Sequence, residues 1–376
     1  MALQPLPDYP WDTLAPFIET AKSHPEGMID LSIGSPVDPT PDVIRAALAE
    51  STDAHAYPTT IGTKDLRVAI GDWYARRRGA SGLGVDAVLP TIGSKELVAL
   101  LPFLLGLGAG DTVVGPRVAY PTYAIGAAIA GAEFVAADDP AEWPESTRLI
   151  WLNSPGNPDG RVWSIEDLAL RAERARELGA VIVNDECYAE LGWDEPWDNT
   201  PIPSILDDRL GDRTGRLAIY SLSKQSNLAG YRAGIVAGDS ALIARLVTVR
   251  KHAGLIVPAP LQHAMTVALG DDAHVAAQRD IYRARRAVLL PAFEAAGFTL
   301  EGSEAGLYLW VTEGKPALES LGHLAELGIM AGPGHFYGDF SPQHVRLSLT
   351  ASDADIARAA TRLRARLTEG NQTPAA

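Results

Sequence analysis

The sequence is poor in cysteine and has no long hydrophobic run. Its 376 residues include one cysteine, Cys187, which excludes a disulfide framework and any metal centre built from several thiolates. The longest apolar run, residues 97–107, is interrupted by Pro102 and Gly106, so it falls short of the roughly 20 residues of a membrane span. The N-terminus lacks the basic segment and apolar core of a signal peptide. These absences predict a cytoplasmic protein that makes no use of a membrane.

Positive charge is also scarce. The chain has 32 basic and 47 acidic side chains and a formal charge of −15, which argues against a general nucleic-acid binder because the field repels phosphates. An acidic small substrate stays open, since local charge in a cleft can oppose the overall sign. A hydrophobic content of 47% excludes wholesale disorder. The length exceeds what a single hydrophobic core fills and predicts two domains or one large lobed unit.

Short apolar runs alternate with helical patterns in the middle of the chain. The runs are bounded by Gly, Pro or Asp, as in strands that are covered on both faces. Strands are expected at residues 112–115, 148–152, 180–184, 217–221 and 234–237, with helices at 94–105, 121–131, 164–178 and 240–252. This alternation predicts an α/β fold whose mostly parallel sheet is sandwiched by helices. Ligands bind at the carboxyl ends of such strands.

The pattern changes after Pro260. Residues 261–297 are nearly all helical, and two apolar runs and two helices follow, which is typical of a smaller α+β unit. We therefore predict three parts. Residues 1–40 form an N-terminal arm that packs on the small domain, residues 41–260 form the large domain, and residues 261–376 form the small one.

The segment around Lys224 contains the most side chains suited to catalysis and ligand binding. Lys224 directly follows a strand, Ser221 and Ser223 precede it, and Arg232 lies eight residues further on. A lysine that is buried close to another cation has a lowered pKa and can form a Schiff base. Two hydroxyls and a guanidinium beside it suit a phosphate. The alternative is a solvated loop lysine among turn-forming serines.

Three more segments follow predicted strands. Asp185 ends a β-branched run, and a buried carboxylate there needs a cation, such as a protonated pyridine nitrogen; alternatively it is a helix N-cap. Asn157 lies between prolines, where it could hydrogen-bond a planar ligand or simply form a turn. Gly93 and Ser94 open a helix, whose free N–H groups attract anions, although this signal is weak alone. Cys187 has no histidine nearby in sequence and is interpreted as a small packing residue.

Together these segments resemble fold-type I aminotransferases, which use pyridoxal 5′-phosphate. The motifs are Asn-x-Pro-x-Asn-Pro-x-Gly at 153–160, Asp-x-x-Tyr at 185–188 and Ser-x-Ser-Lys-(x)3-Leu-x-Gly-x-Arg-x-Gly at 221–234. The resemblance covers almost the whole chain, since residues 31–36, 57–67, 332–338 and 345–348 also match the family. One departure is Asp159, where the family usually has Thr or Ser; this position shapes a turn.

The resemblance implies a role for each matching residue. Lys224 is the Schiff-base lysine and the base that moves the substrate proton, and Asp185 keeps the pyridine nitrogen protonated. Tyr188 and Asn157 hydrogen-bond the phenolic oxygen of the cofactor, and Tyr120 stacks on its ring. The phosphate is held by Ser94, Lys95 (through backbone N–H groups), Ser221, Ser223, Arg232 and Tyr57 of the partner subunit, in a homodimer whose sites are shared at the interface. Arg346, assisted by Gly34 and Asn157, binds the substrate carboxylate; its alternative is a structural ion pair.

The substrates implied are small amino acids and keto acids. Residues 6–14, 30–39 and 223–232 are similar to those of bacterial succinyldiaminopimelate aminotransferases, which act in lysine biosynthesis with glutamate as the amino donor. An aspartate, aromatic or other amino-acid aminotransferase of the same family is the main alternative. A carbon–sulfur lyase shares the cofactor motifs. A cofactor-sensing transcription regulator is disfavoured by the acidic charge and by the short segment before the glycine loop.

Overall fold

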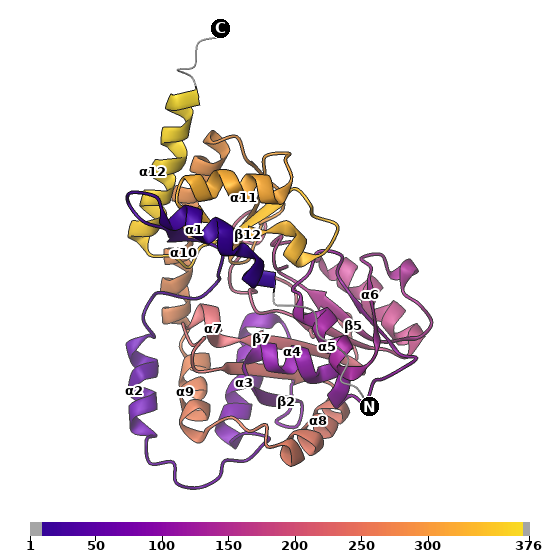
Figure 1. Ribbon diagram of the computed structural model, residues 1–376. Coiled ribbons are helices and arrows are strands. Elements are labelled where there is room, and N and C mark those ends of the chain that lie inside the picture. Colours follow the sequence, from indigo (N-terminus) through magenta and orange to yellow (C-terminus); the bar gives the residue numbers. More distant parts are fainter. Residues whose placement is uncertain (1–9, 371–376) are drawn as a thin grey trace.

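The computed structural model describes residues 10–370, with side chains to residue 365, so residues 1–9 of the predicted arm lie outside the described part. Figure 1 shows a lower part built around a sheet and an upper part that contains both the first and the last described helices. Short 3-10 helices occur at Pro10–Leu14, Pro140–Glu142, Asp208–Leu210 and Gly334–Tyr337. No helix in residues 10–370 is both long and apolar enough to cross a bilayer.

The lower part contains a seven-stranded sheet with the order β2-β8-β7-β6-β5-β3-β4. Its strands are β2 (Val88–Ile92), β3 (Thr112–Gly115), β4 (Glu133–Ala136), β5 (Thr147–Asn153), β6 (Val181–Asp185), β7 (Arg216–Ser221) and β8 (Ala233–Gly238). Neighbours from β7 to β4 pair in parallel, whereas β8 runs antiparallel to both β7 and β2. The predicted mostly parallel α/β sheet is confirmed.

The sequence did not predict β2 and β4, which lie at the two edges of this sheet. Strand β2 contains Pro90, which cannot donate a hydrogen bond to a ladder and is tolerated at an edge. Strand β4 begins with the exposed Glu133, and its other residues are only partly buried. An edge strand has a neighbouring strand on one side only and needs no continuous apolar run. The pattern that identifies central strands therefore does not detect it.

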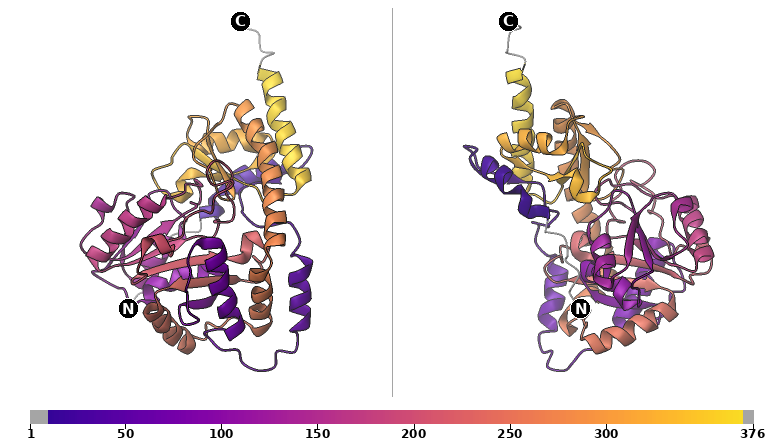
Figure 2. Two further views of the ribbon diagram at one scale, coloured as in Figure 1. Left: turned by 180° about the vertical axis from the view of Figure 1, so that it is seen from behind. Right: turned by 45° about the vertical axis from the view of Figure 1, so that its right-hand side comes forward.

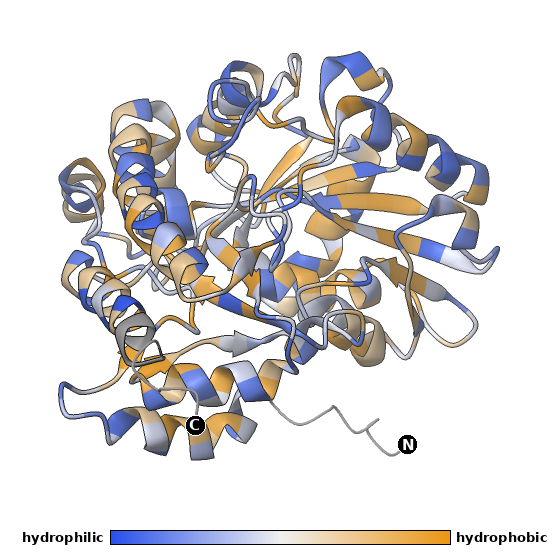
Figure 3. Cartoon of the chain, turned by 90° about the horizontal axis from the view of Figure 1, so that it is seen from above, coloured by the Kyte–Doolittle hydropathy of each residue, from blue (hydrophilic) through white to orange (hydrophobic). Residues whose placement is uncertain are grey.

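Helices cover both faces of this sheet. In β7, Ala218 and Tyr220 face one hydrophobic cluster, and Leu217 and Ile219 face another. The first cluster is completed by α2 (Asp42–Glu50), α3 (Lys64–Arg78), α6 (Ile165–Leu178) and α9 (Ala259–Gly270), and the second by α4 (Gly93–Leu104), α5 (Thr122–Ala130) and α8 (Ser240–Ala253). Figure 3 shows the strands as mainly hydrophobic and these helices as mixed. This two-sided burial explains why the central strands are continuously apolar.

A separate hydrophobic cluster holds the upper part together. It joins α1 (Ala15–Lys22), α10 (Asp272–Ala295), α11 (Ala317–Glu326) and α12 (Asp353–Gly370) with the small sheet β12-β13-β10-β9, whose strands are Gly332–Pro333, His344–Ser348, Tyr308–Thr312 and Thr299–Leu300. Helices α10 and α12 lie side by side in both views of Figure 2. Near the N-terminus, β1 (Ile29–Asp30) pairs in parallel with β11 (Ile329–Met330). The residue limits of the three predicted parts stay a prediction.

Candidate active site

The site begins where parallel strands of the large sheet end. Register places Asn153 of β5 beside Asp185 of β6, and Asp185 beside Ile219 of β7, so the residues that follow these strands meet at one edge. The Nδ2 of Asn153 donates to the carbonyl of Asp185 at 2.9 Å, and its Oδ1 accepts from the N–H of Asn157 at 2.8 Å. Asn153 therefore fixes both neighbouring segments, although the sequence interpretation gave it no role.

Lys224 lies in the single turn α7 (Leu222–Gln225), directly after β7. Its half-buried Nζ donates to the carbonyl oxygen of Gly34, so it points toward the N-terminal glycine loop. Burial lowers the pKa of its ammonium, and the nearby guanidiniums of Arg346 and Arg232 lower it further. These surroundings disfavour the charged ammonium of the lysine relative to its neutral amine.

Asp185 is buried at the end of β6 and forms no ion pair with any described residue. Its carboxylate accepts from the hydroxyl of Tyr123 at 3.0 Å and from the N–H of Cys187 at 3.2 Å. Burial raises the pKa of the Asp185 carboxyl. Such a group calls for a positively charged partner, because neutral donors leave much of the cost of burying the charge uncompensated.

Arg346 projects from β13 between the two parts of the molecule. Its guanidinium donates to Oδ1 of Asn157 at 3.0 Å and to the carbonyl of Ser32, and its buried Nε has no hydrogen-bond partner among the described residues. It forms no ion pair with a described residue, so the predicted alternative of a structural ion pair is not seen in residues 10–370. The guanidinium carbon lies 3.9 Å from the ring centre of Tyr308. The buried cation is held by neutral groups, which a carboxylate could outcompete.

Tyr308 is a central residue that the sequence interpretation missed. Its hydroxyl lies 3.4 Å from that of Tyr188, and its ring meets the ring of Tyr188 edge-on at 5.8 Å. A Cβ added at Gly34 would clash with the Tyr308 hydroxyl, so this glycine allows the loop to approach. Burial raises the pKa of the Tyr308 hydroxyl, but the positive charges of Arg346 and Lys224 lower it and hold this pKa below its usual value. The apolar run at 307–311 predicted the strand, and no sequence signal showed which face Tyr308 occupies.

A small cradle lies at the N-terminus of α4. Gly93 has a φ of +71°, and a Cβ added there would lie 2.8 Å from the guanidinium carbon of Arg232. The hydroxyl of Ser221 donates to that of Ser223 at 2.8 Å. Gly234 lets strand β8 pass close to Gly93, since a Cβ there would lie 2.6 Å from the Gly93 carbonyl carbon. A helix N-terminus and a guanidinium without an acidic partner among the described residues form an anion-binding geometry.

The remaining predicted residues divide into two groups. Ser94 is half-buried in the first turn of α4, and Lys95 follows it with an exposed side chain. Tyr120 is half-buried, and its ring meets that of Tyr123 edge-on at 6.0 Å. Tyr57, in contrast, is fully exposed, and the chain does not bring it to the other site residues. The structure thus gathers every predicted residue except Tyr57 around the strand ends and the facing β13.

Comparison with known proteins identifies the family. Residues 26–363 match the family model described as aminotransferase class I and II. The chain is a class I and II aminotransferase. It is 52% identical over 364 residues to the 4-dedimethylamino-4-oxo-anhydrotetracycline transaminase OxyQ of Streptomyces rimosus, covering 96% of this chain and all of the relative. It is also 52% identical over 359 residues to a probable aminotransferase of Mycobacterium tuberculosis, covering 95% and 85% of the two chains.

The backbone fold of a solved structure supports the same family. The aminotransferase superposes with a TM-score of 0.84 on a probable N-succinyldiaminopimelate aminotransferase from Thermus thermophilus, at 27% identity and covering 94% and 99% of the two chains. The enzyme is therefore a transaminase that uses pyridoxal 5′-phosphate and acts on amino acids and keto acids.

The residues present fit pyridoxal 5′-phosphate. Asp185 offers a ring nitrogen a buried carboxylate that forms no ion pair with a described residue, and the cradle at Gly93 and Arg232 offers a place for a phosphate. Lys224 follows β7, whose neighbours are β6, which ends at Asp185, and β8, which begins directly after Arg232. No group of three or more His, Cys, Asp and Glu side chains suited to a metal ion occurs among the described residues.

Proposed function

We propose that this aminotransferase moves an amino group from N-succinyl-LL-2,6-diaminopimelate to 2-oxoglutarate, giving N-succinyl-2-amino-6-ketopimelate and glutamate, a step of lysine biosynthesis. Two observations support this substrate. Residues 6–14, 30–39 and 223–232 resemble succinyldiaminopimelate aminotransferases in sequence. The backbone follows that of the Thermus thermophilus protein whose description gives the same substrate.

Arg346 is the observation that carries the proposal. Both substrates and both products have a carboxylate on the reacting carbon, and Arg346 is a buried guanidinium without an acidic partner among the described residues. In this role its fork binds the carboxylate, while the Gly34 amide and the Asn157 side chain supply further hydrogen bonds. The Tyr308 ring beneath it keeps the fork in place.

The cofactor is assigned to the residues around Asp185. Pyridoxal 5′-phosphate, when bound, supplies a ring that draws electrons away from the substrate carbon. In this assignment Asp185 holds a proton on the ring nitrogen, Tyr188 and Asn157 donate to the phenolic oxygen, and Tyr120 covers one face of the ring. Tyr123 holds Asp185 by its 3.0 Å hydrogen bond.

The phosphate is assigned to the cradle at the start of α4. Backbone N–H groups of Ser94 and Lys95, the hydroxyls of Ser221 and Ser223, and the guanidinium of Arg232 converge there in this assignment. The sixth donor is Tyr57 of the partner subunit, because the chain's own Tyr57 is fully exposed. The enzyme is accordingly proposed to be a homodimer whose two sites are completed at the interface.

Lys224 is proposed to move the substrate proton. Its pKa is lowered by burial and by two arginines, which favours the neutral amine that acts as a base. Its hydrogen bond to Gly34 places Nζ beside the loop that also approaches the Arg346 carboxylate site. A substrate held by Arg346 thus presents its α-carbon to Lys224.

The substrate assignment is tested with the amino form of the holoenzyme, prepared with glutamate. Candidate keto acids are added at equal concentration, and the return of the cofactor absorbance is followed by stopped flow. We expect N-succinyl-2-amino-6-ketopimelate and 2-oxoglutarate to react fastest. A much faster return with oxaloacetate or phenylpyruvate would assign the enzyme to the aspartate or aromatic aminotransferases instead.

The role of Lys224 is tested separately. Lys224→Ala should lose transamination by at least about 10³-fold, because both the proton carrier and the attachment point are removed. Borohydride treatment should attach the cofactor covalently to the wild type but not to the variant, as measured by mass spectrometry. Lys251→Ala, which alters an exposed lysine of α8, is the matched control and should retain full turnover. Turnover by Lys224→Ala would contradict the mechanism.

A second substrate class is supported by one comparison. OxyQ, at 52% identity, is named for a 4-oxo-anhydrotetracycline. Adding such a compound to the same stopped-flow series separates the two assignments. Reaction with it, and with 2-oxoglutarate as the only reactive keto acid, would favour transamination of a ring ketone.

A further inference from the structure

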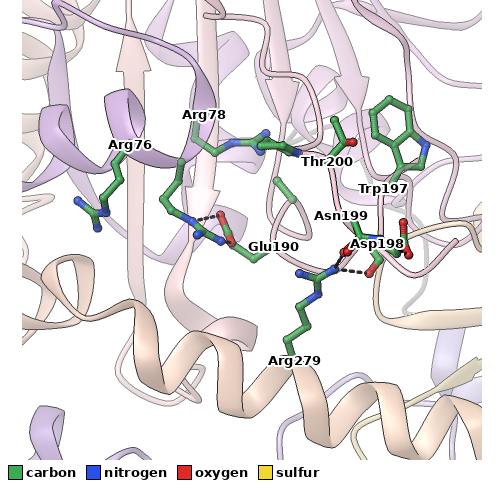
Figure 4. A pocket seen from close by; sticks show the side chains of 12 residues that line it. Arg76, Arg78, Glu190, Trp197, Asp198, Asn199, Thr200 and Arg279 are labelled. Atoms are coloured by element: carbon green, nitrogen blue, oxygen red, sulfur yellow. Dashed lines mark hydrogen bonds and ion pairs between the residues drawn. The ribbon is translucent and has the colours of Figure 1, made fainter. Parts of the chain in front are cut away.

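A pocket lies outside the proposed active site. It has a volume of about 300 Å³ and is bounded by the end of α3, the segment at residues 189–201 and one side of α10. Figure 4 shows Arg279 reaching from α10 toward Asp198 and Asn199, with Glu190 and Thr200 on the opposite sides of the space. No residue assigned to cofactor or substrate lines it.

Arginines dominate the lining although the whole chain is acidic. It contains four arginines but only one glutamate and one aspartate, in a protein of formal charge −15. Three of the arginines have a carboxylate partner: Arg76 pairs with Asp272, Arg77 with Glu190, and Arg78 with Glu186. The fourth forms no ion pair with a described residue, although the Asp198 carboxylate also belongs to the lining.

Arg279 is that fourth arginine. It forms no ion pair with a described residue; one of its terminal nitrogens donates to the carbonyl of Gly192 at 3.0 Å and to that of Asp198. Its buried Nε has no hydrogen-bond partner in the part of the chain that the structure describes, and burial lowers the pKa of its guanidinium. A guanidinium in these surroundings gains from an anion, because carbonyl oxygens compensate its charge only in part.

We propose that this pocket binds a small oxyanion, a phosphate or a carboxylate compound, between Arg279 of α10 and Arg77 of α3. The planar forks of two arginines suit the oxygen atoms of either group. Thr200 is exposed at the rim and adds a hydroxyl. The ligand displaces the Glu190 carboxylate from Arg77. Its affinity therefore includes the free energy of breaking that ion pair.

The position links the pocket to the active site through α10. Three residues after Arg279, the hydroxyl of Tyr282 donates to the backbone carbonyl of Lys224 at 3.2 Å. Six residues after Arg279, Arg285 pairs with Asp38 of the N-terminal loop. An anion bound by both arginines links α3 to α10. Because α10 contacts both Lys224 and the loop following Gly34, the bound anion stabilises the position of α10 relative to the active site.

The test uses the full chain saturated with pyridoxal 5′-phosphate, so that added anions cannot occupy the cofactor's own phosphate site. Inorganic phosphate and citrate are titrated separately by isothermal calorimetry at constant ionic strength. We expect saturable binding of one or both, and the comparison tells a phosphate ligand from a carboxylate ligand. Arg279→Gln should weaken binding by at least about tenfold, the effect of losing a charged hydrogen-bond donor.

Two further variants keep the result independent of folding defects. Thr200→Asp adds a negative charge at the exposed rim without removing an internal contact, and it should also weaken binding about tenfold. Arg283→Gln removes the same charge one turn along α10, outside the pocket lining, and should bind as the wild type does. Absence of saturable binding to the wild type, or equal affinity in Arg279→Gln, Thr200→Asp and the wild type, would overturn the proposal.

Discussion

At the scale of single residues, Tyr308 and Arg346 form a stacked pair whose ring and hydroxyl have separable effects. The ring lies 3.9 Å below the guanidinium, and the hydroxyl faces Tyr188. We expect Tyr308→Phe to keep the KM for the amino acid within about threefold while lowering kcat, because the ring remains and only the hydroxyl is lost. Tyr308→Leu should also raise the KM by roughly 3- to 30-fold, the effect of a lost cation–π contact of about 0.5–2 kcal/mol. Steady-state kinetics of both variants measure this split, and an equal KM in both would contradict it.

Asp159 offers a test of stability against pH. Burial raises the pKa of its carboxyl to about 6, whereas an unfolded aspartate has a pKa of about 3.9. Between these values the folded state binds more protons, so this group's contribution to stability is lost as the pH rises through that window. Asp159→Asn keeps an acceptor for the N–H of Arg161 and removes the charge.

We therefore expect Asp159→Asn to raise the Tm at pH 8 by about 1–2 °C, corresponding to roughly 1 kcal/mol in a chain of this size, and to change it much less at pH 4. Thermal unfolding of both proteins at the two pH values provides the measurement. An equal shift at both pH values would show that the carboxyl does not titrate as expected.

At the scale of elements, the start of α4 depends on Gly93. An alanine there would adopt an unfavourable positive φ and would meet the Arg232 guanidinium. Gly93→Ala should weaken cofactor affinity at least about tenfold, as the lost oxyanion contacts imply. Gly179→Ala is the matched control, since Gly179 has a φ of +63° with open space around it. Equilibrium titration of the cofactor-free proteins should show a loss in the first variant and none in the second.

At the scale of the whole molecule, the exposed Tyr57 predicts that sites are shared between two chains. Tyr57→Phe should bind the cofactor more weakly, because one phosphate donor is lost. Mixing it with Lys224→Ala should restore activity. In a mixed dimer one site combines the intact Lys224 of one chain with the intact Tyr57 of the other. Activity assays after subunit exchange at limiting cofactor measure the recovery. If mixing restores nothing, Tyr57 does not act across the interface.

The sequence by itself determined the central strands, most of the helices after residue 93 and the family, because these depend on local patterns. A strand covered on both faces must be apolar throughout, and the motif around Lys224 lies within fifteen residues. The same pattern failed for the edge strands: β2 is interrupted by Pro90, and β4 is only partly buried.

Only the tertiary structure decided which distant residues share a site. Tyr308 and Arg346 come from β10 and β13, and Gly34 from a loop far away in sequence, yet they meet beside Lys224. The pocket at Arg279 likewise joins α3 to α10 across about two hundred residues. Chain composition, with its charge of −15, could not show either of these groups of side chains. Charges act through distances in space, and folding sets those distances.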